Sequence, residues 1–387
     1  MESVPAPKMK ILIVGAGIGG LTLAAFLEGS NIEYEIVEKV SDWTHQGYSL
    51  SIWNNGRNIL KKLGLADIFD ACGKRIQMYY IYDGKGKLLR KYSLKHFYSD
   101  YGMALTLTSR KDLHDWLMGK VDASKITMNV SVNGITKSGG KMNVDFTNGR
   151  SKQYDLVVGA DGIHSKVRDL VFKEYIVHSS KWRVWYMWVD NKYRSEAAVT
   201  EYIEPGEFIS LFDSGENTLA IIVAEHHNVL WDDPHGRIER LKKSFVDETA
   251  LVPQMFESLK DVDINPADLL RVHLKTWTKD EVVLLGDAAH GFGPYAGIGG
   301  SMALEDGYVL AGELMRVSDT YSLPTALKNY EEQRRKRTGI ARRLSAKMRV
   351  WAVIKSKVLR KLVNLVVPFV PERVLVNDYY ALLKEEI

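Results

Sequence analysis

The chain has 387 residues and a formal net charge of +4, because its 52 Lys and Arg residues nearly balance 48 Asp and Glu residues. This balance predicts no general attraction to nucleic acid, and the single cysteine, Cys72, excludes an internal disulfide and a cysteine metal site. The length exceeds what one hydrophobic core usually holds, which predicts two domains and an extension. Residues 1–8 lack the apolar segment of a signal peptide, so we expect a cytoplasmic protein.

The first predicted elements follow the order of a nucleotide-binding unit. An apolar run over Lys10–Val14 predicts a buried strand, and a loop with four glycines follows at residues 15–20. The apolar density of Leu21–Leu27 predicts a helix, after which a second strand over Tyr34–Val37 ends in Glu38. The glycine pattern therefore lies in the context that a dinucleotide-binding fingerprint requires.

The glycines and the acid have distinct roles in such a unit. Gly15 allows the tight turn, Gly17 lets the backbone approach a pyrophosphate, and Gly20 lets the helix pack closely. Glu38 would accept hydrogen bonds from ribose hydroxyls. An acid at this position favours a ribose with free hydroxyls, so we predict an NAD-like or FAD-like ligand over NADP at this site.

A second candidate segment lies in the middle of the chain. A strand-like run over Tyr154–Val158 leads into Gly159-Ala160-Asp161-Gly162, and Arg168 follows about two helical turns later. Taken alone, the Asp-Gly pair is more often a plain turn than a binding site. The interpretation of Asp161 therefore depends on its order relative to the other segments.

A third candidate segment follows the strand-like run Val282–Leu285. Gly286 and Asp287 come next, and a glycine-rich stretch at residues 294–300 leads into a helical segment near Ser301. An acid at a strand end can accept hydrogen bonds from sugar or ribitol hydroxyls, while glycines let backbone N–H groups approach a flat ring or an anion. Taken alone, the segment fits an ordinary loop equally well.

Taken in order, the three segments resemble the signatures of the class A flavoprotein monooxygenases, the family of 4-hydroxybenzoate hydroxylase, salicylate hydroxylase and the tetracycline-inactivating monooxygenases. The resemblance covers roughly residues 8–330 and implies FAD as the cofactor. The family's arginine at a helix start is answered by Arg110, and its glycine and asparagine after the acidic strand by Gly47 and Asn55. The cofactor-binding residues that it implies are Gly15, Gly17, Ile18, Gly19, Gly20, Glu38, Lys39, Gly47, Arg110, Val132, Asp161, Gly286, Asp287, Pro294, Gly297, Ile298, Gly299 and Gly300.

The third signature departs from the family pattern at two positions. Ile298 stands where the family has a glutamine, and Ser301 stands where it has an asparagine. We expect Ser301 to cap the helix that begins there, with Glu305 strengthening its first turn. The free N–H groups and positive dipole end of this helix would then point toward N1 and the C2 carbonyl of the flavin ring.

The resemblance also implies the architecture. We expect an α/β protein with a Rossmann-like FAD/NAD(P)-binding fold of the glutathione-reductase type, an inserted, mainly antiparallel β-sheet substrate domain and a C-terminal helix. The predicted segments are 1–75, 100–174 and 274–325 for the discontinuous FAD-binding domain, 76–99 and 175–273 for the substrate domain, and 326–387 for the C-terminal helical segment.

Aromatic residues are abundant between the second and third signatures. Short alternating runs such as Phe208–Phe212 and Leu219–Val223 predict an antiparallel sheet there, and the family architecture places the substrate on that sheet, opposite the flavin. Alternation sends only some side chains toward the flavin, and each aromatic residue is individually more often core than contact. The candidate substrate-binding residues are Trp185, Met187, Trp188, Phe212 and Pro294.

The histidines give little evidence of catalysis or metal binding. The pair His226–His227 fits a turn, and His290 fits a structural role beside the cofactor. Because no His, Cys, Asp and Glu residues occur at metal-ligand spacing, we predict no metal site. No residue is identified as a catalytic acid or base.

The C-terminal portion combines charge with an apolar stripe. The dense charge of Lys328–Arg349 predicts a solvated helix face. The stripe within Trp351–Val366 is interrupted by four cations, which excludes a comfortable membrane span. We expect this segment to pack back over the two domains as a helix, with docking on a membrane surface or a partner as the less favoured alternative.

The function that the resemblance implies is oxygen transfer. NADH or NADPH would reduce FAD, molecular oxygen would add to give a flavin 4a-hydroperoxide, and one oxygen atom would pass to a small or polycyclic aromatic substrate. The enzyme would be a monomer or a homodimer that binds no nucleic acid. Two other functions stay open, namely a flavin-dependent reductase or dehydrogenase of an apolar, isoprenoid-like substrate and a non-enzymatic binding protein of the same fold.

Overall fold

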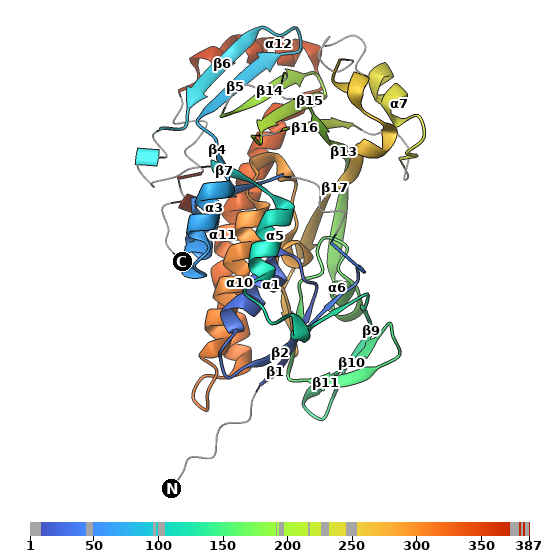
Figure 1. The fold of residues 1–387 in the computed structure, drawn as a ribbon, viewed down its shortest axis with the longest axis vertical. Helices are drawn as coiled ribbons and strands as arrows, with labels where there is room; N and C mark the ends of the chain where they lie inside the picture. The colour runs from blue at the N-terminus through green and yellow to red at the C-terminus, as the bar shows by residue number, and fades with distance from the viewer. Residues whose placement is uncertain are drawn as a thin grey trace.

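The computed structural model describes residues 9–43, 49–95, 98–99, 105–190, 192, 197–215, 217–225, 232–244, 254–371, 379–380, 382–383 and 387. Gly47 and the pair His226–His227 lie outside the described residues. The molecule is elongated, with a large sheet toward each end and long helices and strands between the two sheets (Figure 1).

A six-stranded sheet forms around the predicted nucleotide-binding strand. In spatial order its strands are β18 (Thr278–Lys279), β19 (Val282–Leu284), β12 (Leu156–Gly159), β1 (Lys10–Val14), β2 (Glu33–Glu38) and β8 (Ile126–Met128). All neighbours are parallel except β18 and β19. The central strands are buried because helices cover the sheet. The predicted α/β fold is confirmed, and the carboxyl ends of β1, β12 and β19 meet at one edge.

The structure also contains helices and two small sheets, which lie around and between the two large sheets. The helices are α1 (Ile18–Leu27), α2 (Asn54–Lys62), α3 (Ala66–Cys72), α5 (Arg110–Met118), α6 (Lys166–Val171), α7 (Arg237–Ser244), α9 (Asp287–His290), α10 (Gly299–Met315), α11 (Leu323–Ala352) and α12 (Lys357–Val366). Short 3₁₀ turns include η4 (Asp261–Asp263), η5 (Pro294–Ala296) and η6 (Val367–Phe369). The small sheets contain β3 (Ser49–Trp53), β4 (Lys74–Arg75) and β7 (Leu105–Ser109), and β9 (Val132–Ser138), β10 (Lys141–Phe146) and β11 (Ser151–Tyr154).

A seven-stranded sheet forms the other end of the molecule. In spatial order it contains β17 (Asn265–Leu274), β13 (Tyr175–Val189), β16 (Thr218–Glu225), β15 (Glu207–Asp213), β14 (Ala198–Glu204), β5 (Met78–Asp83) and β6 (Leu88–Ser93). Only β14 and β5 are parallel neighbours. The predicted mainly antiparallel sheet is therefore confirmed, whereas the boundaries assigned to the two domains stay a prediction.

The two faces of this sheet bury different side chains, because successive residues of a strand point to opposite sides. One face packs against α7 and includes Trp185 and Met187. The opposite face includes Trp182 and Val184, which pack with Tyr295 of η5 and with the end of α11. Only the second face lies toward the third signature.

The C-terminal helices differ from the expectation in two ways. Arg334 and Arg337 of α11 are buried, so the predicted solvated face is wrong at these positions, because both form ion pairs with Glu305 of α10. The chain also breaks after α11, and the hydroxyl of Ser356 caps a separate helix, α12, by accepting a hydrogen bond from the N–H of Leu359. Within the described parts of the chain, no helix is both long and apolar enough to cross a membrane.

Candidate flavin site

The glycine loop after β1 has the geometry that a dinucleotide requires. Gly15 has a φ of +107°, and a Cβ there would lie 2.5 Å from the carbonyl oxygen of Ala160. A Cβ on Gly20 would lie only 2.1 Å from the carbonyl oxygen of Gly15. A Cβ on Gly17 would meet no atom within 4 Å. The loop thus needs two of its glycines for packing and leaves Gly17 facing open space.

Glu38 lies beside this loop at the end of β2. Its buried carboxylate accepts hydrogen bonds from the N–H of Ala16 (2.8 Å) and the N–H of Val40 (3.2 Å). The N–H of Val130 donates to the Glu38 carbonyl (2.9 Å), which brings the segment leading to Val132 alongside. Of the other residues implied here, Ile18 and Gly19 belong to α1, Val132 is buried, and Lys39 is exposed. The structure therefore brings Glu38 and Val132 to the same edge as the loop.

Asp161 follows β12 and binds backbone N–H groups in the first turn of the next helix, α6, whose N-cap is Ser165. Its Oδ2 accepts hydrogen bonds from the backbone N–H groups of Lys166 (2.6 Å) and Val167 (3.0 Å). Its Oδ1 is buried and has no hydrogen-bond partner among the described residues. Burial raises the pKa of this carboxyl. A hydroxyl or amide group of a ligand could donate the missing hydrogen bond to this oxygen.

Arg168, the basic residue of the second signature, has a structural role. Its buried guanidinium donates to the carbonyl oxygens of Ala288 (3.1 Å) and Ile163 (2.8 Å). It therefore ties the second signature to α9 of the third, and it explains why an arginine follows the Asp-Gly pair at this distance.

Asp287 begins α9 directly after Gly286, whose φ is +59°. Asp287 is exposed. The protein around its carboxyl still desolvates it enough to raise its pKa, while the nearby charges of His290 and Arg110 oppose the rise. Arg110 is exposed at the start of α5, and the helix is held at the glycine loop by His114, whose Nε2 lies 3.0 Å from the Ala16 carbonyl oxygen. Arg110 therefore lies close enough to Asp287 for its charge to act on that carboxyl.

A buried charged network supports this segment from behind. Asp306 of α10 lies 2.6 Å from Nε2 of His290, accepts from the N–H of Gly286 (2.8 Å), and pairs with Nε of Arg334 (2.6 Å). Glu305 pairs with Arg334 as well and accepts from Nδ2 of Asn55 (2.7 Å). The network fixes the backbone around Asp287 and gives His290 the structural role that was predicted.

The expected capping of α10 is wrong. The helix begins at Gly299, and no side chain caps it. The hydroxyl of Ser301 is buried and accepts a hydrogen bond from the N–H of Trp53 (3.0 Å) instead. Glu305 cannot support the first turn because the buried ion pairs hold it. Without a side-chain cap, the first N–H groups of α10 stay available to a ligand.

The glycines before α10 shape the same edge, and Ile298 packs away from solvent. Gly297 has a φ of +57°, and its carbonyl oxygen accepts a hydrogen bond from Nε1 of Trp53 (3.1 Å). Ile298 is fully buried in an apolar cluster with Trp53, Met302 and Tyr379. An aliphatic side chain suits this cluster, which explains how the site tolerates the loss of the family's glutamine.

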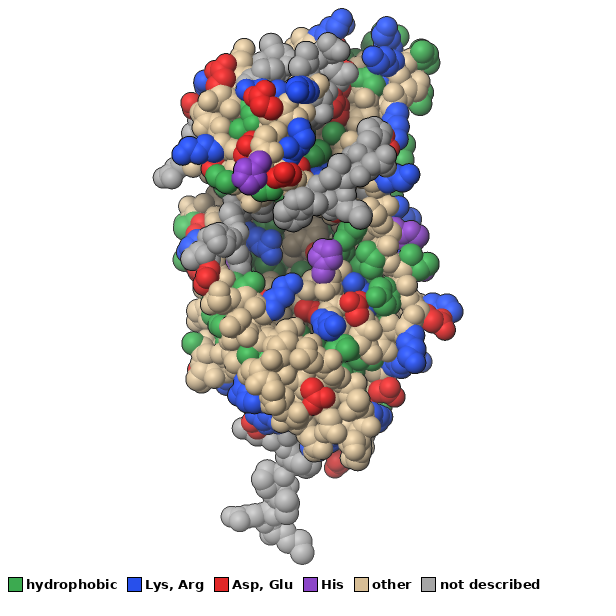
Figure 2. Space-filling view, turned by 90° about the vertical axis from the view of Figure 1, so that its right-hand side faces the viewer, with side chains coloured by type: hydrophobic (Ala, Val, Ile, Leu, Met, Phe, Trp, Pro, Cys, Tyr) green, Lys and Arg blue, Asp and Glu red, His purple; other side chains and the backbone are tan. Residues whose placement is uncertain are grey.

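These residues fit a bound FAD. Gly17 offers open space beside the first loop, Asp161 offers an unpaired buried acceptor, and α10 offers uncapped N–H groups. Pro294, Gly299 and Gly300 lie partly or fully exposed at the same stretch. The face drawn in Figure 2 is hollowed between the parts of the molecule that carry the two large sheets.

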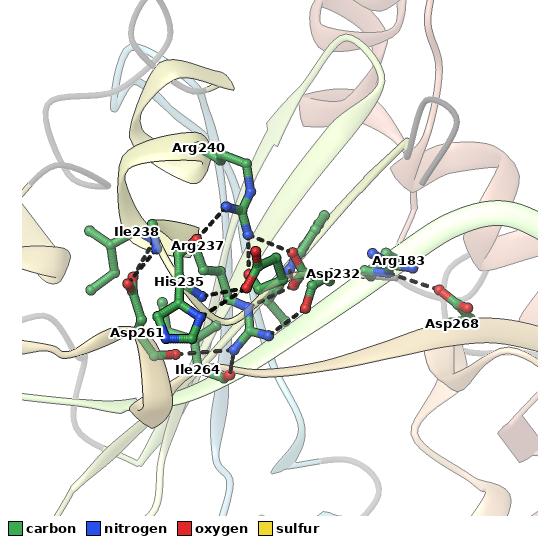
Figure 3. Close-up of polar contacts among 12 residues, drawn as sticks. Arg183, Asp232, His235, Arg237, Ile238, Arg240, Asp261, Ile264 and Asp268 are labelled. Atoms are coloured by element: carbon green, nitrogen blue, oxygen red, sulfur yellow. Dashed lines mark hydrogen bonds and ion pairs between the residues drawn. The ribbon is translucent and has the colours of Figure 1, made fainter. Parts of the chain in front are cut away.

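The candidate substrate residues do not all lie on one side of the seven-stranded sheet. Trp185 and Met187 face α7, and Nε1 of Trp185 donates to Asp232 (3.0 Å). Figure 3 shows Arg237 and Arg240 converging on the same carboxylate. By alternation Trp188 points to the opposite face, where Phe212 packs with the cluster around Ile298. The structure therefore groups Trp188, Phe212 and Pro294 on the flavin side, and it leaves Trp185 and Met187 outside that group.

Glu201 is a candidate residue that the sequence analysis did not identify. It lies on β14 two residues after Val199, so it shares the face that packs with Ile298. Its Oε1 accepts hydrogen bonds from the hydroxyls of Tyr79 and Ser210. Among the described residues, no cation pairs with Glu201 and no donor reaches its Oε2. Burial raises the pKa of its carboxyl. An acid at an inward position of an alternating strand was the available signal.

A basic cavity of about 360 Å³ lies behind the third signature. Its described lining residues include no acid and are Arg271, Phe292, Gly293, Tyr295, Gly339, Arg342, Arg343, Ser345, Ala346 and Arg349. In the described part of the chain, none of the four arginines forms an ion pair. Burial lowers the pKa of Arg342, as do the charges of Arg271 and Arg335, and the buried hydroxyl of Tyr295 has no partner there. The cavity is suited to an anion.

Comparison with known proteins shows the family. The sequence-family model described as "FAD binding domain" matches residues 8–344. The aurachin C monooxygenase/isomerase of Stigmatella aurantiaca is 31% identical over 334 residues, which cover 84% of this chain and 85% of the relative. The FAD-dependent urate hydroxylase of Klebsiella pneumoniae is 27% identical over 84% of this chain and 86% of its own. The chain belongs to the FAD-binding-domain family.

A solved structure shows the same fold. The crystal structure of Klebsiella pneumoniae HpxO complexed with FAD and uric acid superposes with a TM-score of 0.88, at 24% identity, over 97% of each chain. Together with the sequence relatives, this defines the protein as a class A flavin-dependent monooxygenase that uses FAD.

Proposed function

We propose that this monooxygenase hydroxylates a planar aromatic substrate that carries an N–H or O–H group, using NADH or NADPH and molecular oxygen. The observation that carries the proposal is the carboxyl of Glu201, which lies on the flavin side of the substrate sheet and has one oxygen that no donor among the described residues reaches. An acceptor in an apolar setting selects a ligand that brings a donor, because an unpaired acceptor is costly there.

Bound FAD supplies the electron transfer and oxygen chemistry of the reaction. The backbone around Gly297 and the first turn of α10 would hold the flavin ring. Phe212 and Trp188, which alternation places on one face of the sheet, would contact a planar substrate. Glu201 would orient that substrate by accepting its hydrogen bond. Urate, the substrate in the name of one relative, carries several N–H groups and is an instance of this class.

The first test is a substrate screen with two readouts. A panel of phenols, indoles, quinolones and purines would be incubated with the FAD-loaded protein, oxygen and each nicotinamide, while nicotinamide oxidation and product mass are followed. We expect a substrate that stimulates oxidation and gains one oxygen atom. Turnover that persists without oxygen would instead identify a reductase or dehydrogenase. A compound that stimulates nicotinamide oxidation without giving a product of higher mass would be excluded as a substrate.

Replacing Glu201 tests the recognition step. Glu201→Gln should lower kcat/KM for the substrate found in the screen by about 10- to 150-fold. This corresponds to the loss of a hydrogen bond to a charged group, about 1.5–3 kcal/mol. FAD retention and the slow nicotinamide oxidation without substrate should not change. Because burial raises the pKa of Glu201 above the ordinary value, wild-type activity should fall as pH decreases through this raised pKa, and the variant should lack that step.

The matched control is Glu239→Gln, which makes the same change on the exposed face of α7. It should behave as the wild type in every measurement. A kcat/KM of Glu201→Gln within twofold of the wild-type value would contradict the assigned role.

We also propose that the basic cavity receives the phosphates of the reductant. Its four arginines lack carboxylate partners among the described residues, and a nicotinamide dinucleotide carries at least two phosphate charges. The single cysteine fits a reducing compartment, so we propose that the enzyme acts in the cytoplasm, where the reductant is available.

The double change Arg342→Gln with Arg343→Gln should raise KM for the nicotinamide about tenfold, a loss of about 1.4 kcal/mol. FAD retention and kcat at saturating reductant should stay at wild-type values. Steady-state kinetics at constant oxygen measures both, and Arg316→Gln, at the exposed C-cap of α10, is the control. An unchanged KM would rule out this location for the reductant.

A further inference from the structure

Helix α12 exposes an apolar stripe to solvent. The side chains of Val358, Leu359, Leu362, Leu365 and Val366 follow one another at helical spacing, and η6 adds Phe369. Their exposed fractions lie between 50% and 83%. The expectation that this segment packs back over the two domains is therefore wrong for these six side chains.

Two arginines fix which face of the helix points inward. Arg360 is buried, and its guanidinium donates to the carbonyl oxygens of Trp351 (2.7 Å) and Ala352 (3.1 Å) at the end of α11. Arg90 of β6 donates to the carbonyl oxygen of Pro368 (2.5 Å). The polar side of α12 is thus anchored to the protein, which holds the apolar side outward.

The stripe lies at one extremity of the molecule. In Figure 1, α12 runs beside β5 and β6 at the end opposite the six-stranded sheet, and the same end in Figure 2 carries basic side chains next to hydrophobic ones. The stripe therefore lies at an end of the molecule. Six large apolar side chains on one exposed face are more than scattered surface residues and indicate a surface that another body covers.

The charged residues around the stripe indicate which kind of partner covers it. Residues 333–371 contain twelve Lys and Arg residues and no Asp or Glu. Lys357 and Lys361 flank the stripe and are exposed. Two copies of this helix face to face would bring these positive charges together, which opposes self-association. An anionic lipid surface would accept the apolar side chains and attract the cations at the same time.

We propose that α12 and η6 dock this enzyme on the surface of an anionic lipid bilayer. The stripe enters the boundary between head groups and acyl chains, and Lys357 and Lys361 lie at the level of the lipid phosphates. The protein lies on the membrane and does not span it. The proposal does not depend on the substrate proposed above.

Vesicle co-sedimentation tests the proposal with the full chain loaded with FAD. Vesicles of phosphatidylcholine alone would be compared with vesicles that contain equal parts of phosphatidylcholine and phosphatidylglycerol. We expect the wild type to pellet with the anionic vesicles and to bind the neutral ones at least about tenfold more weakly. Leu362→Glu with Leu365→Glu should abolish pelleting, and Lys357→Gln with Lys361→Gln should weaken it about tenfold.

The control places two glutamates at exposed apolar positions elsewhere, Ile176 and Val262. Ile176→Glu with Val262→Glu should bind the anionic vesicles as the wild type does. Leu362, Leu365, Ile176 and Val262 are all exposed. The thermal unfolding temperatures of Leu362→Glu with Leu365→Glu and of Ile176→Glu with Val262→Glu should therefore match that of the wild type. Absence of wild-type pelleting, or unchanged pelleting of Leu362→Glu with Leu365→Glu, would overturn the proposal. Light scattering could instead show a wild-type dimer that Leu362→Glu with Leu365→Glu converts to a monomer. This result would show that a second copy of the chain covers the stripe, and it would also overturn the proposal.

Discussion

Arg334→Met should lower the free energy of unfolding by about 3–5 kcal/mol, the usual cost of removing one partner from a buried ion pair. Arg334 is fully buried between Glu305 and Asp306, and its loss would leave two carboxylates without their shared cation. Urea denaturation of the FAD-free protein, followed by circular dichroism and tryptophan fluorescence, measures the change. FAD retention should fall as well, because Asp306 holds the backbone N–H of Gly286.

The adjacent residue provides the control for this prediction. Arg335→Met removes an ion pair with Glu331 that is partly exposed, so it should cost only about 0–1 kcal/mol. A difference of less than about 1 kcal/mol between the two variants would show that the network does not hold the third signature in place.

The same network predicts the acid sensitivity of the protein. Burial by itself would raise the pKa of Asp306, but the charges of His290 and Arg334 outweigh it and hold this pKa well below its ordinary value. The stabilisation from Asp306 is therefore present above its unfolded-state pKa, near 3.9, and is lost as pH falls toward the lower folded-state pKa. The stability of Arg334→Met should depend less steeply on pH in this acidic range.

Gly17→Ala should give a folded protein that does not retain FAD. The backbone at Gly17 has φ −75° and ψ −177°, which alanine adopts without strain, and its Cβ would meet no protein atom within 4 Å. The methyl group would instead occupy the space that the pyrophosphate approaches. We expect FAD affinity to fall on the order of 100-fold, or about 2.7 kcal/mol, measured by quenching of flavin fluorescence.

Two further glycines make this prediction specific. Gly312→Ala adds a methyl group in open space on α10 and should keep full FAD affinity. Gly20→Ala would place its Cβ 2.1 Å from the carbonyl oxygen of Gly15, so it should fail to fold. Wild-type FAD affinity in Gly17→Ala would mean that the pyrophosphate does not pass this loop.

Local sequence signals predicted the cofactor end of the molecule well. The strand Lys10–Val14, the loop glycines and Glu38 are neighbours in the chain, and the structure brings them together as expected. The prediction failed where a side chain's partner is distant in sequence. Ser301 was expected to cap its own helix, but its hydroxyl accepts from Trp53, 248 residues away.

The substrate side was predicted less well for a related reason. Alternation shows that Trp185 and Trp188 point to opposite faces, but it does not show which face lies toward the flavin. That choice depends on α7 covering one side and η5 and α11 the other. Glu201 was missed because the alternation of its strand, the one available signal, does not show that Tyr79 and Ser210 lie beside this acid.

The sequence by itself determined the family, the cofactor and the order of the elements, because these depend on short segments whose chemistry is local. Only the tertiary structure decided which charges are buried and which apolar residues are exposed. Arg334 looks like a solvated residue in the sequence and is buried, whereas Leu365 looks like core and is exposed. The physical reason is that burial depends on what packs against a helix face, and that partner comes from elsewhere in the chain or from outside it.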